Sequence, residues 1–308
     1  MFEINGAVVI SLFMTVLLIS THVLFSLENK LSINNTTTKM TATKPLKMVV
    51  FDMDETLGSF IELAMFWEAL ELYYGYNLLE ERFFEVLDIF PEFLRPKIVV
   101  ILEYLKNKKE KRVCDQVMIY TNNQGPKSWV KMISNYLNNK INYILFDKII
   151  AAFKIKGKVV EVGRTSHDKS VDDLIRCTRI PTNTEICFVD DQKHPLMVQD
   201  NVYYINVKSY NFSMPFEEMA SLYYDTFSEK YNIEDIKDDF INKITSSMER
   251  YKYTVFEKSE EEYNADVVIG KQILIHLEDF FKNGRSQNTR KRRKNIKQGT
   301  RRNKSSIL

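Results

Sequence analysis

The stretch VVFDMDETLG, residues 49–58, predicts both the fold of this 308-residue chain and the place where a ligand binds. The apolar run from Met48 to Phe51 is typical of a strand buried on both faces of a parallel sheet. Two carboxylates, Asp52 and Asp54, follow the strand, with Thr56 two residues further on. In an open α/β sheet, ligands bind in the crevice outside the carboxyl ends of the strands. We therefore expect this strand to present a nucleophile and an acid to a ligand.

Three later stretches have polar residues at comparable positions. VMIYTNN (117–123) and ICFVDD (186–191) are apolar strands followed by polar residues, and HDKS (167–170) precedes a helical segment. Strand and helix patterns alternate between these stretches, which predicts a parallel sheet with right-handed crossovers. The expected fold class is α/β, a Rossmann-like parallel sheet flanked by helices. Two further short strands are expected over 149–153 and 158–162.

The order of these stretches resembles the haloacid dehalogenase (HAD) superfamily: Asp-x-Asp-x-Thr, a strand-final Thr, a Lys, and a strand-final Asp-Asp. The chain is most similar to the phosphatases of the RNA polymerase C-terminal domain and their NIF-like relatives. Three details support this: DETL (54–57), LRP (94–96) and a Lys-Ser pair (169–170). The resemblance covers about residues 46–213. It implies a HAD-type, Mg²⁺-dependent phosphomonoester hydrolase that forms an aspartyl-phosphate, and it favours phosphoserine or phosphothreonine in a protein as substrate.

The carboxylates at these positions suit hydrolysis of a phosphomonoester, which needs a nucleophile, neutralisation of phosphate charge and a proton for the leaving group. Asp52 is the candidate nucleophile. Asp54 is the candidate acid, which later activates water. A carboxylate that approaches a dianion is repelled unless a cation lies between them, so we expect Mg²⁺ held by Asp52, the backbone carbonyl of Asp54 and Asp190. Asp191 stands where the NIF-like relatives usually have Asn, so its share in binding the metal stays open.

Phosphate-binding groups are expected on two other segments. Thr121 ends a strand and can donate its hydroxyl to a phosphate oxygen, helped by the backbone N–H groups of Asn122 and Asn123. Lys169 is expected to supply a fixed positive charge, because it precedes Asp190 by one helix and one strand. Three other lysines compete for this role: Lys154, Lys156 and Lys158. The histidines His167 and His194 lack metal-ligand spacing and are expected to be loop residues.

Two helical regions are expected to accompany the catalytic domain over 46–213. Residues 59–93 hold ten aromatic side chains and predict a helical insertion after the first motif, in the place of a cap or flap. Within it, Phe66 and Trp67 are expected to shape the substrate pocket. Residues 214–283 show helical periodicity and predict a C-terminal helical extension. Residues 284–308 predict a disordered basic tail, and 285–308 hold ten of the 43 Lys and Arg residues but none of the 41 acids.

The first 45 residues admit two interpretations. The uncharged segment 6–27 is long enough to cross a bilayer, and the lysines that follow it favour a cytoplasmic catalytic domain behind a single-pass anchor and a linker. If the native chain instead starts at Met40, the protein is expected to be cytoplasmic or nuclear. The segment 6–27 is then not an anchor.

The function also has alternatives at this stage. The same type of site serves polynucleotide end phosphatases, and the basic tail 285–308 suits contact with nucleic acid or a targeting signal. A non-catalytic scaffold that binds partners through its helices and tail is a third hypothesis. The presence of all the expected chemical groups counts against the scaffold.

Overall fold

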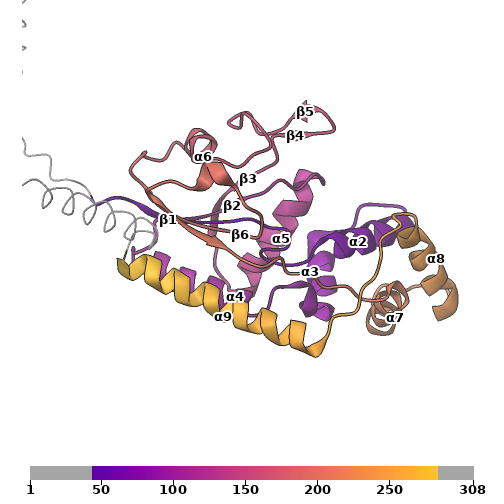
Figure 1. Ribbon diagram of the computed structural model, residues 1–308. Helices are drawn as coiled ribbons and strands as arrows, with labels where there is room; N and C mark the ends of the chain where they lie inside the picture. Colours follow the sequence, from indigo (N-terminus) through magenta and orange to yellow (C-terminus); the bar gives the residue numbers. More distant parts are fainter. Residues whose placement is uncertain (1–43, 284–308) are drawn as a thin grey trace, which may run out of the picture. The chain divides into compact units, whose positions relative to one another are not determined.

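The computed structural model describes residues 44–283, apart from the side chain of Lys127. The chain forms two compact units, 1–44 and 45–308, and the elements below belong to the second. The strands of its main sheet are, in chain order, β1 (Lys47–Phe51), β2 (Gln116–Tyr120), β3 (Phe146–Ile150), β6 (Glu185–Asp190) and β7 (Val202–Asn206). All neighbours pair in parallel in the order β3-β2-β1-β6-β7, with β1 at the centre (Figure 1). The predicted α/β class with a Rossmann-like sheet is confirmed.

Eight α-helices accompany the sheet within residues 44–283. They are α2 (Ile61–Tyr74), α3 (Glu80–Ile89), α4 (Ile98–Glu110), α5 (Lys127–Lys140), α6 (Val171–Thr178), α7 (Phe216–Phe227), α8 (Lys237–Glu249) and α9 (Glu260–Asn283). Short elements complete the chain: the 3₁₀ turns η1 (Pro91–Phe93) and η2 (Pro195–Met197), and the hairpin β4 (Lys154–Ile155) and β5 (Lys158–Val159). The predicted helical insertion after the first motif is α2 and α3, and the predicted C-terminal extension is α7 to α9.

The two faces of the sheet bury different cores because successive side chains of a strand point to opposite faces. Val49 and Phe51 of β1 belong to the larger core, to which α4, α5 and α9 contribute. Met48 and Val50 belong to the smaller core, which α6 covers with Leu174 and its neighbours (Figure 1). Burial on both faces explains why β1 is an unbroken apolar run, and it places the end of β1 in the middle of the sheet edge.

The insertion and the C-terminal extension pack against each other, which the sequence did not predict. Phe240 of α8 lies 4.9 Å from the ring of Tyr73 on α2, measured between centroids. Phe66 of α2 makes edge contacts with Phe90 and with Tyr223 of α7, at 5.5 and 5.8 Å. The expectation that Phe66 shapes a substrate pocket is therefore wrong: its ring is fully buried in the core.

The expected strands over 149–153 and 158–162 are displaced in the structure. The edge strand β3 begins three residues earlier, at Phe146, because the Asp147 carboxylate accepts a hydrogen bond from the Val117 backbone N–H at 2.8 Å and ties this polar segment to β2. Only Lys158 and Val159 of the second segment are strand, and they pair with β4 in a hairpin outside the main sheet. Apolar content alone favoured the wrong residues at this edge.

The localisation prediction is corrected. Among the residues that the structure describes, no helix combines the length and the apolar character needed to cross a membrane. A single-pass anchor with a cytoplasmic catalytic domain is therefore not carried forward. The segment 6–27 on which it was based lies outside the described residues, as do Met40 and the basic tail 284–308.

Glu62 gives the stability of this fold a pH dependence. The side chain is fully buried on α2, where its carboxyl accepts the Met214 backbone N–H at 3.2 Å, and burial raises its pKa from 4.5 to about 7. The folded protein therefore holds a proton that the unfolded chain releases above pH 4.5. This contribution to stability is complete below pH 4.5 and is lost as the pH rises through 7.

We expect Glu62→Gln, which keeps the acceptor and removes the charge, to be more stable than the wild type at pH 8. The gain should be up to about 3 kcal/mol, and most of it should vanish at pH 5. Urea unfolding of both proteins at the two pH values measures the difference. A gain of the same size at both pH values would contradict the role given to the carboxyl proton.

Candidate active site

Asp52 lies immediately beyond β1, at the centre of the carboxyl edge of the sheet. Its backbone N–H donates to the Val189 carbonyl at 2.9 Å and so continues the parallel pairing between β1 and β6 by one residue. Its side chain is 10% exposed, and Oδ1 lies 2.5 Å from Nζ of Lys169. The strand that the sequence pointed to thus delivers a buried carboxylate to the edge of the sheet.

Lys169 joins two carboxylates from neighbouring strands. Besides Asp52, its ammonium group donates to Oδ2 of Asp190 at 2.7 Å, and the side chain is 2% exposed. The next residue, Ser170, is the N-cap of α6: its Oγ accepts the Asp173 N–H at 3.1 Å, and its own N–H donates to the Tyr120 hydroxyl. This cap fixes the backbone beside Lys169. The competing lysines lie instead on the β4–β5 hairpin or its turn: Lys154, Lys156 and Lys158.

Asp190 ends β6, and Asp191 follows it; the two residues complete a compact acidic group. Carboxylate oxygens of Asp52, Asp190 and Asp191 all lie within 4.8 Å of one another, an arrangement that could hold a metal ion. Thr56 positions Asp191: the Thr56 hydroxyl lies 3.2 Å from Oδ1 of Asp191 and accepts the Asp191 N–H at 3.1 Å. The threonine of the Asp-x-Asp-x-Thr motif therefore fixes the Asp-Asp pair that follows the strand β6.

Two residues at the end of β7 and just beyond it hold the turn at Asp190 and Asp191 from the other side. Asn206, the last residue of β7, donates its carboxamide to the backbone carbonyls of Asp190 and Asp191 at 3.1 and 3.0 Å. Ser209 donates its hydroxyl to Oδ2 of Asp191 at 2.7 Å. Sequence reasoning missed both residues, because a lone Asn and a lone Ser after a strand are not distinguishable from solvated loop residues.

Asp54 is held by the loop that follows β2. The Asn123 carboxamide donates to Oδ2 of Asp54 at 2.9 Å, and the Asn123 backbone N–H donates to the Thr121 hydroxyl at 3.0 Å. Thr121 is thus linked to Asp54 through Asn123, and the Asn123 N–H, one of the two expected to bind phosphate, is already used by Thr121. Within residues 44–283, Oδ1 of Asp54 and Oδ1 of Asn122 are buried without a hydrogen-bond partner.

The backbone that follows Asp52 and Asp54 is fixed by a buried guanidinium. Glu55 has the left-handed φ of 54°, which is unfavourable for a non-glycine residue. Its carbonyl accepts Nη2 of Arg95 at 2.5 Å, and the Thr56 carbonyl accepts Nε of the same guanidinium at 2.6 Å. Gly58 closes the turn, since a Cβ there would meet the Phe93 carbonyl at 2.4 Å. Arg95 therefore fixes this turn by binding backbone carbonyls.

Burial and mutual repulsion dominate the electrostatics. Burial raises the pKa of Asp52 to about 7, although Lys169 opposes the shift, and burial also raises the pKa of Asp54. Burial and the neighbouring acids raise the pKa of Glu55 to about 7. For Asp190 the effect of burial is outweighed by His194 and Lys169, which hold its pKa below the ordinary value. This edge of the sheet favours a bound cation, because each carboxylate destabilises the charge of the others.

The residues present fit a hard divalent cation. Mg²⁺ takes oxygen ligands and keeps several waters, so one or two carboxylates with backbone oxygens suffice. The three clustered carboxylates supply such oxygens, and the burial of Asp52 and Asp190 leaves their negative charge poorly solvated. The side chain of Asp54 is turned to Asn123 and is not part of this group.

Both histidines lie in loops, as expected, but their contacts differ. Nε2 of His194 lies 3.3 Å from Oδ2 of Asp190, and its ring packs against Phe188. His167 contributes its backbone carbonyl, which accepts Nη2 of Arg164, and its ring contacts Phe153. His194 therefore contacts an acid of the cluster, while His167 serves the loop.

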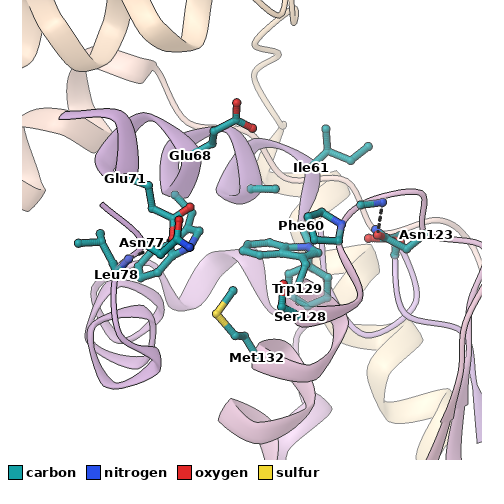
Figure 2. A pocket seen from close by; sticks show the side chains of 15 residues that line it. Phe60, Ile61, Glu68, Glu71, Asn77, Leu78, Asn123, Ser128, Trp129 and Met132 are labelled. Atoms are coloured by element: carbon teal, nitrogen blue, oxygen red, sulfur yellow. Dashed lines mark hydrogen bonds between the residues drawn. The ribbon is translucent and has the colours of Figure 1, made fainter. Parts of the chain in front are cut away.

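A cavity adjoins the site at Asp54. It has a volume of about 660 Å³ and lies between α2 and α5, with Trp67 and Trp129 in its lining (Figure 2). Trp67, unlike Phe66, thus takes the place expected for a pocket residue of the insertion. Trp129 was not predicted there, because nothing in the local pattern of α5 separates a pocket residue from a core residue.

The chain matches no protein-family model, and no curated protein is significantly similar to it. The likeness to HAD phosphatases therefore remains a resemblance of motifs.

Proposed function

We propose that this protein is a Mg²⁺-dependent phosphomonoester hydrolase that works through an aspartyl-phosphate. The observation that supports this most is the convergence of Asp52, Asp190 and Asp191 within 4.8 Å, with Lys169 bound to two of them. A nucleophile, a cation site and a fixed positive charge then share the carboxyl edge of one parallel sheet, where α/β proteins bind ligands.

In the first step a carboxylate oxygen of Asp52 attacks phosphorus and the bond from phosphorus to the ester oxygen breaks. Asp54 gives its proton to the departing oxygen, so the products are an alcohol and the phosphorylated Asp52. The burial that raises the pKa of Asp54 keeps a proton available for this transfer, and its Oδ1 is free of hydrogen bonds to residues 44–283.

In the second step the Asp54 carboxylate takes a proton from water, whose oxygen attacks phosphorus. The bond from phosphorus to Asp52 breaks, which releases phosphate and restores both carboxyl groups. Lys169 offsets the charge of the phosphoryl oxygens, and the Thr121 hydroxyl donates to one of them. A bound divalent cation would be held by Asp52, Asp190 and Asp191 and would supply charge neutralisation between the carboxylate and the phosphate.

The favoured substrate is phosphoserine or phosphothreonine in a protein. The adjoining cavity leaves room for groups of the substrate beyond the phosphate, since its volume of about 660 Å³ is that of a typical ligand pocket. The experiment that tests the proposal is phosphate release by the full chain in Mg²⁺ from four substrates: an aryl phosphate, phosphopeptides, end-phosphorylated oligonucleotides and small phosphorylated metabolites. Release from none of them would reject the proposal, and release from oligonucleotides alone would move it to polynucleotide end processing.

The role of Asp54 predicts a dependence on the leaving group. Asp54→Asn should lower kcat on an alkyl phosphate by about 10²–10⁴-fold, because a poor leaving group needs the proton. The loss on a nitrophenyl phosphate, whose leaving oxygen needs little protonation, should be much smaller. Steady-state kinetics on the two substrates gives the comparison, and Asp200→Asn, the same change at the exposed opposite edge of the sheet, serves as control. Equal losses on both substrates would contradict the role of Asp54 as acid.

A further inference from the structure

The cavity beside Asp54 has one wall made of tryptophan. Trp67 of α2 and Trp129 of α5 each make an edge contact with Phe83, at 5.4 and 5.2 Å between ring centroids. Phe83 is fully buried and holds both indoles in place, while the indoles are 4% and 6% exposed. Phe60 and Met132 extend this apolar lining between the two ends of the cavity (Figure 2).

The charged residues in the lining are all acids. Asp54 stands at one end, and Glu68 and Glu71 come from α2; among the described side chains that line the cavity there is no Lys or Arg. Glu68 and Glu71 share a face of the helix because they are three residues apart. Glu71 also accepts the Leu78 backbone N–H at 3.1 Å, which keeps its carboxylate at the end of the cavity away from Asp54. Figure 2 shows Glu71 with Leu78 and Asn77 at one end and Asn123 at the other.

An occupant of this cavity must therefore be apolar along its length and positive at its far end. A Lys or Arg side chain has this character, since its methylene groups cover apolar surface while its charged head reaches the acids. Arg gains further from the face of an indole. A polynucleotide has the opposite character, because its phosphates would meet three carboxylates.

We propose that this cavity is a specificity subsite for the polypeptide on one side of a phosphorylated residue, and that it selects a Lys or Arg three or four residues away. The inference rests on the proposed function, which places the leaving oxygen at Asp54. On α2, Glu68 and Glu71 lie seven and ten residues beyond Ile61, which is at the Asp54 end. At about 1.5 Å per helical residue this is roughly 10–15 Å. An extended peptide at about 3.3 Å per residue covers that distance in about three to four and a half residues.

Tryptophan fluorescence measures occupation of the cavity directly, because the chain has two tryptophans and both line it. The full chain carrying Asp52→Asn binds substrate without consuming it. It is titrated in Mg²⁺ with phosphoserine peptides that lack Trp and carry Arg, Ala or Glu at the third and fourth positions, on either side of the phosphoserine. The peptides form two series, one with the substitutions before the phosphoserine and one with them after it. In one of the two series we expect the Arg peptide to bind about tenfold more tightly than the matching Glu peptide.

Glu68→Lys, added to Asp52→Asn, should abolish or reverse this preference. Glu81→Lys makes the same charge change at an exposed position of α3 outside the lining, and it should keep the preference. Equal affinity for the Arg and Glu peptides in both series, or tighter binding of a 5′-phosphorylated oligonucleotide, would overturn the subsite. If Glu68→Lys does not fold, the peptide series on the unaltered cavity still decides.

The outcome is separable from that of the proposed function. A wild-type chain that releases no phosphate, with the Arg preference intact, would refute the hydrolase and keep a binding site for basic phosphopeptides. A wild-type chain that hydrolyses an aryl phosphate but whose Asp52→Asn form shows no preference would refute the subsite alone.

Discussion

Asp52→Asn should lower kcat on an aryl phosphate by at least about 10⁴-fold, because an amide oxygen cannot act as the nucleophile and Asp190, the other carboxylate bound to Lys169, is assigned to the cation in the proposed mechanism. The same change should not lower the stability of the fold at pH 7. Burial raises the pKa of Asp52 to about 7, so the ionised carboxylate already opposes folding. Steady-state kinetics and urea unfolding measure the two effects separately.

Asp200→Asn is the matched control, since it makes the same change at an exposed position just before β7, at the opposite edge of the sheet. Its kcat should stay within about twofold of the wild type. Near-wild-type turnover by Asp52→Asn would remove Asp52 as nucleophile. A comparable loss in both variants would show that the measured effect is one of folding.

Removal of the divalent cation should abolish turnover, and Mg²⁺ added after the chelator should restore it. The reason is that Asp52 otherwise meets the phosphate as one anion meets another, with Lys169 already engaged by Asp52 and Asp190. Mg²⁺ at about 100 times its Kd should also raise the free energy of unfolding by about 2.7 kcal/mol. Asp190→Asn should lose both the activity and most of this stabilisation.

Both readouts are needed because a chelator can inhibit by other routes. Urea unfolding of the wild type, Asp190→Asn and Asp200→Asn, each with and without Mg²⁺, assigns the cation to this cluster. Full activity in excess chelator would contradict the cation mechanism. Equal stabilisation of wild type and Asp190→Asn would place the cation elsewhere.

The central sheet and the members of the acidic cluster could be predicted from the sequence. A strand buried on both faces leaves an unbroken apolar run, and the polar residue after such a run must emerge at the carboxyl edge of a parallel sheet. Asp52 and Asp190 follow two such runs, so pairing of β1 with β6 brings them together whatever the loops do. The edge strand β3 was misplaced because its polar side chains remove that signal.

The contacts that position the cluster were decided by the tertiary structure. Asn123 beside Asp54, and Asn206 and Ser209 around Asp191, connect segments that are separated in sequence. His194 lies only four residues beyond Asp190, but its contact depends on the path of the loop between them. A polar residue on a loop has the same local pattern whether it faces solvent or a catalytic group. The partner of such a residue depends on strand order and on the path of another loop. The residues next to it in sequence determine neither.

The sequence by itself thus determined the parallel sheet and the acids at its edge, because consecutive residues encode burial and strand direction. Only the tertiary structure decided that Trp67 and Trp129 face one cavity with Glu68 and Glu71, while Phe66, one residue away, is in the core. Adjacent residues on a helix are turned by about 100° from each other, and an aromatic side chain is favourable on either face. The packing of α2 against α7 and α8 determines which face opens to a ligand.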